Sequence, residues 1–220
     1  MAELVRWSWV ENNLDDIQQA SIEHLQLVGA SLGLAIAISI PIAILVRQRR
    51  IPFIAVNAVS AALYTIPSLA MFAFLLSFVG IGFEPAVIAL AVYCLQLIIR
   101  NAVVGLRGVS GPVQEAARGM GLTRRQILMR VELPLALPAI IAGIRLAAVS
   151  TVGIATIAVY IGAGGLGVLI VNDGIQRALF VTPIFVGAVI ATVMAIVIDL
   201  ALVGIERALT PWQRARAGTG

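Results

Sequence analysis

Few residues of this chain have side chains suited to chemistry. His24 is the only histidine and Cys94 the only cysteine, so the sequence offers no set of metal ligands and no intrachain disulfide. No nucleophile–base pair or phosphate-binding loop accompanies them. We therefore expect that His24 forms hydrogen bonds, that the chain binds no metal or cofactor, and that it is not an enzyme.

The glycine run at 162–167 matches the spacing of a dinucleotide-binding loop, G-x-G-x-x-G. Such a site also needs a strand–helix–strand unit and an acidic residue about 20 positions further on. Position 187 is glycine, and apolar runs flank the motif on both sides. We interpret the run as a tight turn between membrane helices, where small residues allow close packing. Gly164 and Gly165 are candidates for a gate or a partner contact, with plain packing as the alternative.

The most informative charged residues lie in a helix-forming segment between two apolar runs, at 107–134. Pro112 suits a first helical turn, Glu115 and its neighbours continue the helix, and Gly121 is a residue that ends one. Thr123 is a suitable cap for the next helix, which leads into an apolar run. A membrane protein needs only a short turn to reverse direction. A segment of this length therefore indicates a surface for another protein.

The composition is that of a membrane protein. Hydrophobic residues make up 60% of the chain and charged residues 12%, with a mean hydropathy of +1.03. Soluble domains have about 25% charged residues. All fifteen basic residues are arginine, and they are not interleaved with aromatic residues as in a nucleic-acid-binding surface. The sequence predicts an all-α integral membrane protein with no nucleic-acid partner.

Crossing a bilayer takes about 20 mostly apolar residues. The stretches that meet this requirement are 25–46, 54–80, 85–106, 135–160 and 181–205. We therefore predict an external or interfacial segment 1–23, a transmembrane domain 24–207 that includes the charged loop 107–134, and a tail 208–220.

Charges in the connecting segments predict the orientation. Arginines follow the first, third and fifth spans, whereas acidic residues dominate the opposite loops. Because basic loops stay in the cytoplasm, we predict an external N-terminus, a cytoplasmic C-terminus and a cytoplasmic charged loop. Segment 1–23 has no apolar core and is therefore not a cleavable signal peptide. Trp7 and Trp9 suit a short helix at the lipid headgroups.

The charged loop resembles that of the permease subunits of ABC importers. The family pattern is Glu-Ala-Ala, three residues, Gly, nine residues, Ile, one residue and Leu-Pro. Valine replaces the isoleucine here, and the matching residues are Glu115, Ala116, Ala117, Gly121, Val131, Leu133 and Pro134. The resemblance implies that the loop, with Arg118, forms the contact through which an ATPase is coupled to the membrane domain.

Further segments are similar to the osmoprotectant branch of this family of binding-protein-dependent transport components. Its members are permeases for glycine betaine, choline, carnitine and proline betaine. The similarity covers roughly 22–207 and is clearest at His24-Leu25, Ser39-Ile40-Pro41, 65–70, Gly80-Ile81-Gly82, Arg100-Asn101 and 161–167. It implies the type I ABC importer permease fold, with about five transmembrane helices and a short cytoplasmic coupling helix, in a bacterial cell membrane.

The same resemblance implies partners. Two permease subunits, identical or homologous, would form the pathway, and two cytoplasmic ABC ATPases would bind ATP and Mg. A separate extracytoplasmic binding protein would deliver the substrate. A permease for another small polar solute, such as an amino acid or a sulfonate, is the alternative. An ATP-independent carrier or channel is a weaker alternative, because the sequence has no internal repeat and the charged loop would be unexplained.

Some polar and aromatic residues in the spans are candidates for the pathway or its gate. The rings of Tyr64, Phe72 and Tyr93 would attract a quaternary ammonium group, although aromatic residues in spans more often pack or face lipid. Arg100-Asn101 is a candidate for the inner gate, with an orientation anchor as the alternative. The full set of candidates is Tyr64, Pro67, Ser68, Phe72, Arg100, Asn101, Gly164 and Gly165.

Arg145 and Asp199 lie within predicted spans. A charge in the bilayer interior is unfavourable unless it is paired or reaches water. We therefore predict a structural ion pair between the fourth and fifth spans, with a role in the pathway as the alternative.

Overall fold

The computed structural model describes residues 5–212, and every regular element in that range is helical. Glu3, Arg214 and Arg216, which contributed to the predicted orientation and tail, lie outside the described residues. The long elements are α2 (Leu14–Val46), α3 (Arg50–Thr65), α4 (Ser68–Val79), α5 (Phe83–Arg107), α8 (Leu133–Ala155) and α9 (Val181–Leu209). The short ones are α1 (Trp7–Asn12), α6 (Gly111–Gly119), α7 (Arg124–Ile127), the π-helical η1 (Leu128–Glu132), the 3-10 helix η2 (Thr156–Ile161) and the π-helical η3 (Val168–Ile175).

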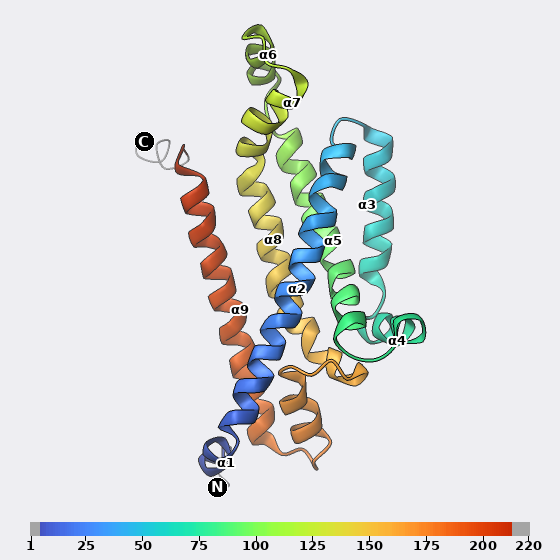
Figure 1. Ribbon diagram of the computed structural model, residues 1–220, viewed down its shortest axis with the longest axis vertical. Helices are drawn as coiled ribbons and strands as arrows, with labels where there is room; N and C mark the ends of the chain where they lie inside the picture. The colour runs from blue at the N-terminus through green and yellow to red at the C-terminus, as the bar shows by residue number, and fades with distance from the viewer. Residues whose placement is uncertain (1–4, 213–220) are drawn as a thin grey trace.

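Helix α5 is the centre of the bundle, and α2 and α8 pack along it (Figure 1). Helices α3 and α4 lie on one flank, while α9 lies on the other and contacts α8 and η3. The largest apolar cluster of buried side chains includes Leu27, Phe72, Leu90, Val152 and Leu166. The core is therefore shared among the helices of the bundle, whose outer faces remain apolar.

The described residues contain four helices that are long and apolar enough to cross a membrane, and a bent pair of helices that would make a fifth span if it is counted as one, against the five spans that the sequence predicts. The four are Leu14–Val46, Phe83–Arg107, Arg124–Ile161 and Val181–Leu209. Helices α3 and α4 pass the same test only as a pair, and they meet at an angle of 98°, which is the geometry of a broken span or a re-entrant loop. The predicted span over 54–80 is therefore a bent pair of helices.

Proline at position 67 explains the break. A residue before proline is pushed out of the helical conformation, and Ile66 has an extended backbone with ψ 128°. Proline also has no N–H to continue the ladder. The hydroxyl of Tyr93 donates a hydrogen bond of 2.6 Å to the carbonyl of Ile66, which satisfies a backbone group that the break exposes. Helix α4 consequently lies across the bundle (Figure 1).

The predicted short N-terminal helix is present as α1, which contains both Trp7 and Trp9. The ring of Trp9 packs edge-on against Phe180 at 5.9 Å, and the backbone N–H of Arg6 donates to the Thr182 hydroxyl at 3.0 Å. These contacts fasten α1 to the start of α9. Helix α2 already begins at Leu14, within the segment 1–23 that we expected to be external.

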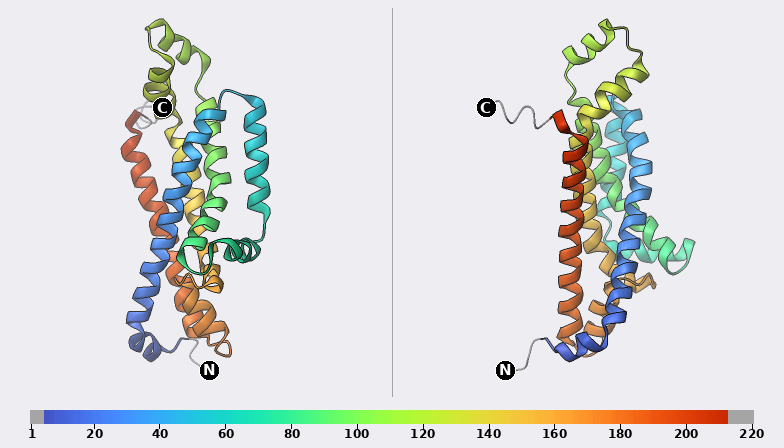
Figure 2. Two further views of the ribbon diagram at one scale, coloured as in Figure 1. Left: turned by 45° about the vertical axis from the view of Figure 1, so that its right-hand side comes forward. Right: turned by 60° about the vertical axis from the view of Figure 1, so that its left-hand side comes forward.

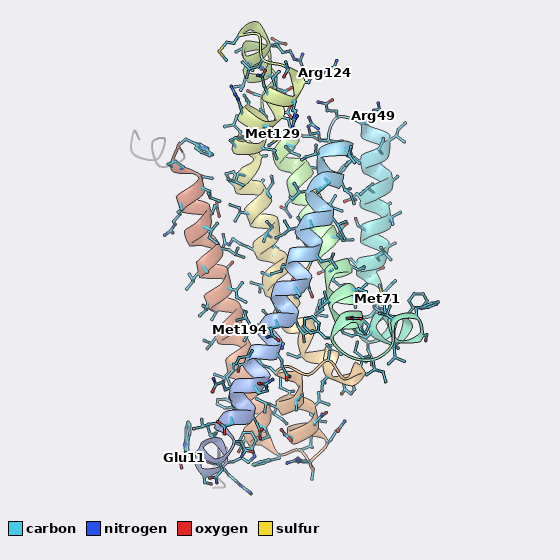
Figure 3. All side chains as sticks on the ribbon, viewed as in Figure 1. Glu11, Arg49, Met71, Arg124, Met129 and Met194 are labelled. Carbon is cyan, nitrogen blue, oxygen red and sulfur yellow. The ribbon has the colours of Figure 1, made fainter. Side chains whose placement is uncertain are left out.

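The charged side chains gather at the two ends of the bundle. Figure 3 shows Arg49 and Arg124 at one end, beside the segment α6–α7, and Glu11 at the other. We call the first of these the arginine-rich end. There the guanidinium of Arg107 donates to the carbonyls of Arg47 at 2.8 Å and Arg49 at 3.2 Å, which closes the turn between α2 and α3.

Arg145 and Asp199 form the predicted ion pair between α8 and α9. Two parallel hydrogen bonds join them, Nε to Oδ1 at 2.8 Å and Nη2 to Oδ2 at 2.9 Å. Glu206 lies 3.7 Å from the same guanidinium. The bidentate geometry is the strong form of this interaction and fixes α9 to α8.

We expect Asp199→Leu to lower the melting temperature of the purified protein in nanodiscs, because Arg145 keeps only the more distant Glu206. The double variant Arg145→Met with Asp199→Leu should melt at a higher temperature than Asp199→Leu alone, since no guanidinium is then left without its partner. The fall in melting temperature of the double variant is compared with the sum of the falls in the two single variants. A fall at least as large as that sum would contradict a pair that acts mainly by mutual neutralisation.

Close contact between α5 and α8 gives a second prediction. A Cβ at Gly143 would lie 2.6 Å from Cβ of Asn101 and 3.0 Å from the Leu97 carbonyl oxygen. Gly143→Ala should therefore lower the free energy of unfolding by about 1–3 kcal/mol, the usual cost of overpacking. Gly153→Ala in the same helix is the control, because nothing lies within 4 Å of that site. Denaturant titration in detergent compares the two, and equal effects would contradict close packing at Gly143.

Candidate functional site

Residues 111–127 form a helix–turn–helix at the arginine-rich end, as the sequence predicts. Pro112 lies in the first turn of α6, and Gly121 has a left-handed backbone with φ +82° just after this helix. The Thr123 hydroxyl accepts from the Gln126 N–H at 3.4 Å, while the Gln126 side chain accepts from the Thr123 N–H at 2.8 Å. This reciprocal cap starts α7. We call the pair of helices the α6–α7 hairpin.

The α6–α7 hairpin projects beyond the ends of the other helices (Figure 2). Glu115, Ala116 and Arg118 are exposed on it, whereas Ala117 is buried and its carbonyl accepts from the Leu122 N–H at 3.2 Å. The motif Glu115-Ala116-Ala117 therefore has two roles: its first two side chains face outward, and the third packs inside the hairpin. The arrangement gives a rigid, protruding surface.

Leu133 and Pro134 do not lie on that protruding surface. They begin α8 and line an apolar cavity of about 540 Å³ together with side chains of α2 and α9. The match to the family pattern therefore spans two structural parts, the hairpin and the helix that follows it.

A buried ion pair connects the hairpin to the bundle. Glu132, at the end of η1, is 4% exposed, and its carboxylate lies 2.9 Å from Nε of Arg47 at the end of α2. Helix α7 continues through η1 into α8 without interruption. A displacement of the hairpin would therefore reach α8 along the helix and α2 through the ion pair. The sequence analysis did not identify this pair. The feature that could have indicated it is Glu132, an acidic residue among arginines and directly before Leu133-Pro134.

The second candidate region is a cavity of about 480 Å³ between α3, α5 and α8. It brings together three of the predicted pathway residues, Tyr64, Arg100 and Asn101, with Gln96 and Leu146 also in the lining. Asn101 donates its side-chain amide to the Leu97 carbonyl at 2.8 Å. Arg100 is exposed. We call this the α3–α5 cavity.

Polar residues that the sequence analysis overlooked stand beside this cavity. The Ser60 hydroxyl donates to Oε1 of Gln96 at 2.5 Å, and the Gln96 amide points toward Oδ1 of Asn57 at 3.5 Å. The signal was in the spacing. Positions 57, 60 and 64 of one helix and positions 93, 96 and 100 of the other are both i, i+3, i+7, so each set lies on one helix face.

The rings of Tyr64 and Tyr93 face each other across α3 and α5. Their centroids are 6.0 Å apart at 72°, an edge-to-face arrangement. The Tyr93 hydroxyl is held by the Ile66 carbonyl, while Tyr64 is 37% exposed. One ring is therefore fixed in the core, and the other presents its surface to the cavity.

Other predicted pathway residues lie elsewhere. Phe72 is fully buried in the core cluster, so it packs instead of lining the cavity. Pro67 and Ser68 lie at the bend between α3 and α4.

Gly164 and Gly165 lie in a turn beside Glu23 and His24 of α2. Both have left-handed backbones, and a Cβ on Gly164 would clash with the Glu23 carboxylate. The Gly165 N–H donates to that carboxylate at 2.9 Å, and the Leu166 N–H donates to Nδ1 of His24 at 3.3 Å. His24 is fully buried, and its other ring nitrogen lies 3.0 Å from the Val152 carbonyl. The hydrogen-bonding role expected for His24 is confirmed, and the tight turn fastens the segment after α8 to α2.

Comparison with known proteins agrees with this architecture. The chain is 42% identical over 191 residues to the carnitine transport permease protein OpuCB of Listeria monocytogenes, a match that covers 86% of each protein. It is 38% identical over 205 residues to the osmoprotectant import permease protein OsmW of Salmonella typhimurium strain LT2, covering 91% of this chain and 94% of that one. The choline transport system permease protein OpuBD of Bacillus subtilis strain 168 is 37% identical over 195 residues, covering 89% and 86%.

Solved structures show the same fold. An inward-facing MetNI methionine ABC transporter superposes with a TM-score of 0.75 at 26% identity, covering 88% of this chain and 96% of that one. An amino acid ABC transporter solved with histidines superposes with a TM-score of 0.76 at 19% identity, covering 93% and 99%. Residues 31–214 match the family of binding-protein-dependent transport system inner membrane components. With its long apolar helices and projecting hairpin, the chain belongs to this family of multi-pass membrane transport permeases.

Proposed function

We propose that this chain is the membrane subunit of an ATP-driven importer for a quaternary-amine osmoprotectant, delivered by a separate binding protein. The observation that most favours an ATP-driven role is the projecting α6–α7 hairpin, joined to α8 by continuous helix. The solute class follows from relatives named for carnitine, osmoprotectants and choline. ATP and Mg would bind to partner ATPase subunits, and this chain would catalyse no reaction.

Coupling in this proposal is mechanical. Exposed Glu115, Ala116 and Arg118 would contact a groove on a cytoplasmic ATPase subunit. Closure of the ATPases on ATP would draw the hairpins of two permease subunits together. The displacement would move α8 through η1 and would reach α2 through the Arg47–Glu132 pair. Because α8 packs along α5, movement of α8 would alter the α3–α5 cavity.

We also propose an orientation and an assembly. The arginine-rich end would face the cytoplasm, because basic segments stay on that side, so the N-terminus would be external. Five spans are few for a complete pathway, so a second permease subunit, identical or homologous, would complete it. The binding protein would dock at the opposite end, where α1 and the turn that contains Gly164 and Gly165 lie.

The left-handed turn at Gly121 provides a test of coupling. A residue with a side chain in this conformation costs about 1–2 kcal/mol, more if it is β-branched. We therefore expect Gly121→Val to distort the hairpin, so that the complex retains less ATPase subunit on co-purification and loses most of its transport. Gly119→Ala is the control, because that site has open space around it and lies inside α6. Undiminished ATPase binding by Gly121→Val would contradict the proposed docking surface.

Transport itself is tested with the reconstituted complex. Proteoliposomes that contain this chain, its partner permease and the ATPase are loaded with ATP, and the binding protein is added outside. We expect uptake of labelled glycine betaine, carnitine or choline that ceases when ATP is replaced by a non-hydrolysable analogue. Uptake driven equally well without the ATPase would support a carrier or channel, and accumulation of an amino acid or sulfonate instead would support the other solute class.

A further inference from the structure

Arg100 differs from other arginines that lack a side-chain partner among residues 5–212, such as Arg50 and Arg124, because it lies inside a helix and not at its first residue. Arg47 and Arg145 pair with carboxylates, and Arg107 donates to two backbone carbonyls. Among residues 5–212, no carboxylate, carbonyl or ring partners Arg100 in this way. It lies seven residues before the end of α5, about 10 Å inside the helix end at 1.5 Å per residue.

The surroundings of Arg100 explain its exposure. Arg100 lines the α3–α5 cavity, whose other polar lining residues, Tyr64, Gln96 and Asn101, are neutral. A charge kept within an apolar layer without a partner marks a functional site more often than a structural one. A guanidinium presents a planar fork of donors that fits a carboxylate with two parallel hydrogen bonds. The missing partner is therefore best explained as an anionic group of a solute.

The opposite part of the cavity suits a cation. Tyr64 is exposed, and its ring is braced edge-on by Tyr93, which is fixed through its hydroxyl. The face of a tyrosine ring attracts quaternary ammonium groups. Tyr93 is two helical turns from Arg100 on one face of α5, and the ring that it braces, Tyr64, lines the same cavity as Arg100.

We propose that the α3–α5 cavity selects solutes that have both a quaternary ammonium group and a carboxylate. Arg100 binds the carboxylate, and Tyr64 contacts the ammonium group. The inference rests on the proposed function and narrows it: betaines and carnitine are favoured, whereas choline is disfavoured. Choline has a hydroxyl in place of the carboxylate, so it leaves Arg100 unpaired and brings a second positive charge near it.

The test compares uptake of labelled glycine betaine and labelled choline by the reconstituted complex. The variants are Arg100→Gln, which removes the charge, and Arg100→Lys, which keeps the charge but not the fork. We expect Arg100→Gln to lower kcat/KM for glycine betaine at least about tenfold, the usual effect of losing a hydrogen-bonded ion pair. Choline uptake should stay the same or rise. Arg100→Lys should give an intermediate value for glycine betaine.

Arg50→Gln is the matched control, because it removes one arginine from α3, another helix of this cavity, at a site outside the lining. Its ratio of glycine betaine uptake to choline uptake should equal that of the wild type. ATP hydrolysis without solute shows whether each variant complex is assembled. If the Arg100→Gln complex does not assemble, the ratio of glycine betaine uptake to choline uptake in Arg100→Lys tests whether Arg100 binds the carboxylate.

Three results would overturn the inference. The first is a wild type that transports choline but neither glycine betaine nor carnitine. The second is an unchanged uptake ratio in both Arg100 variants. The third is an equal fall for both solutes in an assembled complex, which indicates that Arg100 pairs with an acid of the partner permease or with lipid. A wild type without ATP-dependent uptake of any of these solutes would instead refute the proposed function itself.

Discussion

The close packing of α8 against α5 is the contact on which the two candidate regions both depend. Gly143 of α8 packs against Asn101 and the Leu97 carbonyl of α5. Nearer the end of α5, Gly105 packs against the side chain of Ala139 and the carbonyl of Ala136 in α8. Helix α8 continues from the α6–α7 hairpin, and α5 provides most of the lining of the α3–α5 cavity. Small residues at this seam let the backbones approach, which is how helices associate where lipid removes the hydrophobic drive between them. Because this contact is close, a movement of α8 would also displace α5.

The broken span follows from a second constraint, the satisfaction of every backbone group in lipid. Pro67 interrupts the ladder, and Tyr93 compensates by donating to the Ile66 carbonyl. The same tyrosine then braces Tyr64 at the cavity. The bend therefore does more than turn the chain, because the side chain that stabilises it also positions an aromatic ring of the candidate site.

Several charged side chains of this protein connect helices or turns, whereas Arg100 lines a cavity. Arg145 with Asp199 joins α8 to α9, Arg47 with Glu132 joins α2 to η1, and Glu23 fastens the glycine turn to α2. These contacts connect elements at both ends of the bundle. Arg100 stands apart because its surroundings in the described part of the chain are neutral. Arg100 and the ring of Tyr64 line the same cavity, and in our proposal they bind a zwitterion and do not join helices.

The sequence by itself determined the helical membrane architecture, the family, the hairpin with its cap at Thr123 and its stop at Gly121, and the pair of Arg145 with Asp199. Each of these depends on local propensity, on apolar length or on the high cost of an isolated charge, all of which can be read along one chain. Only the tertiary structure decided that Ala117 faces inward, that Phe72 is buried, and that Gln96 meets Ser60. It also joined Arg47 to Glu132, which are 85 positions apart. These outcomes depend on how helices are rotated and bent against one another, and that is set by side-chain packing between segments distant in sequence.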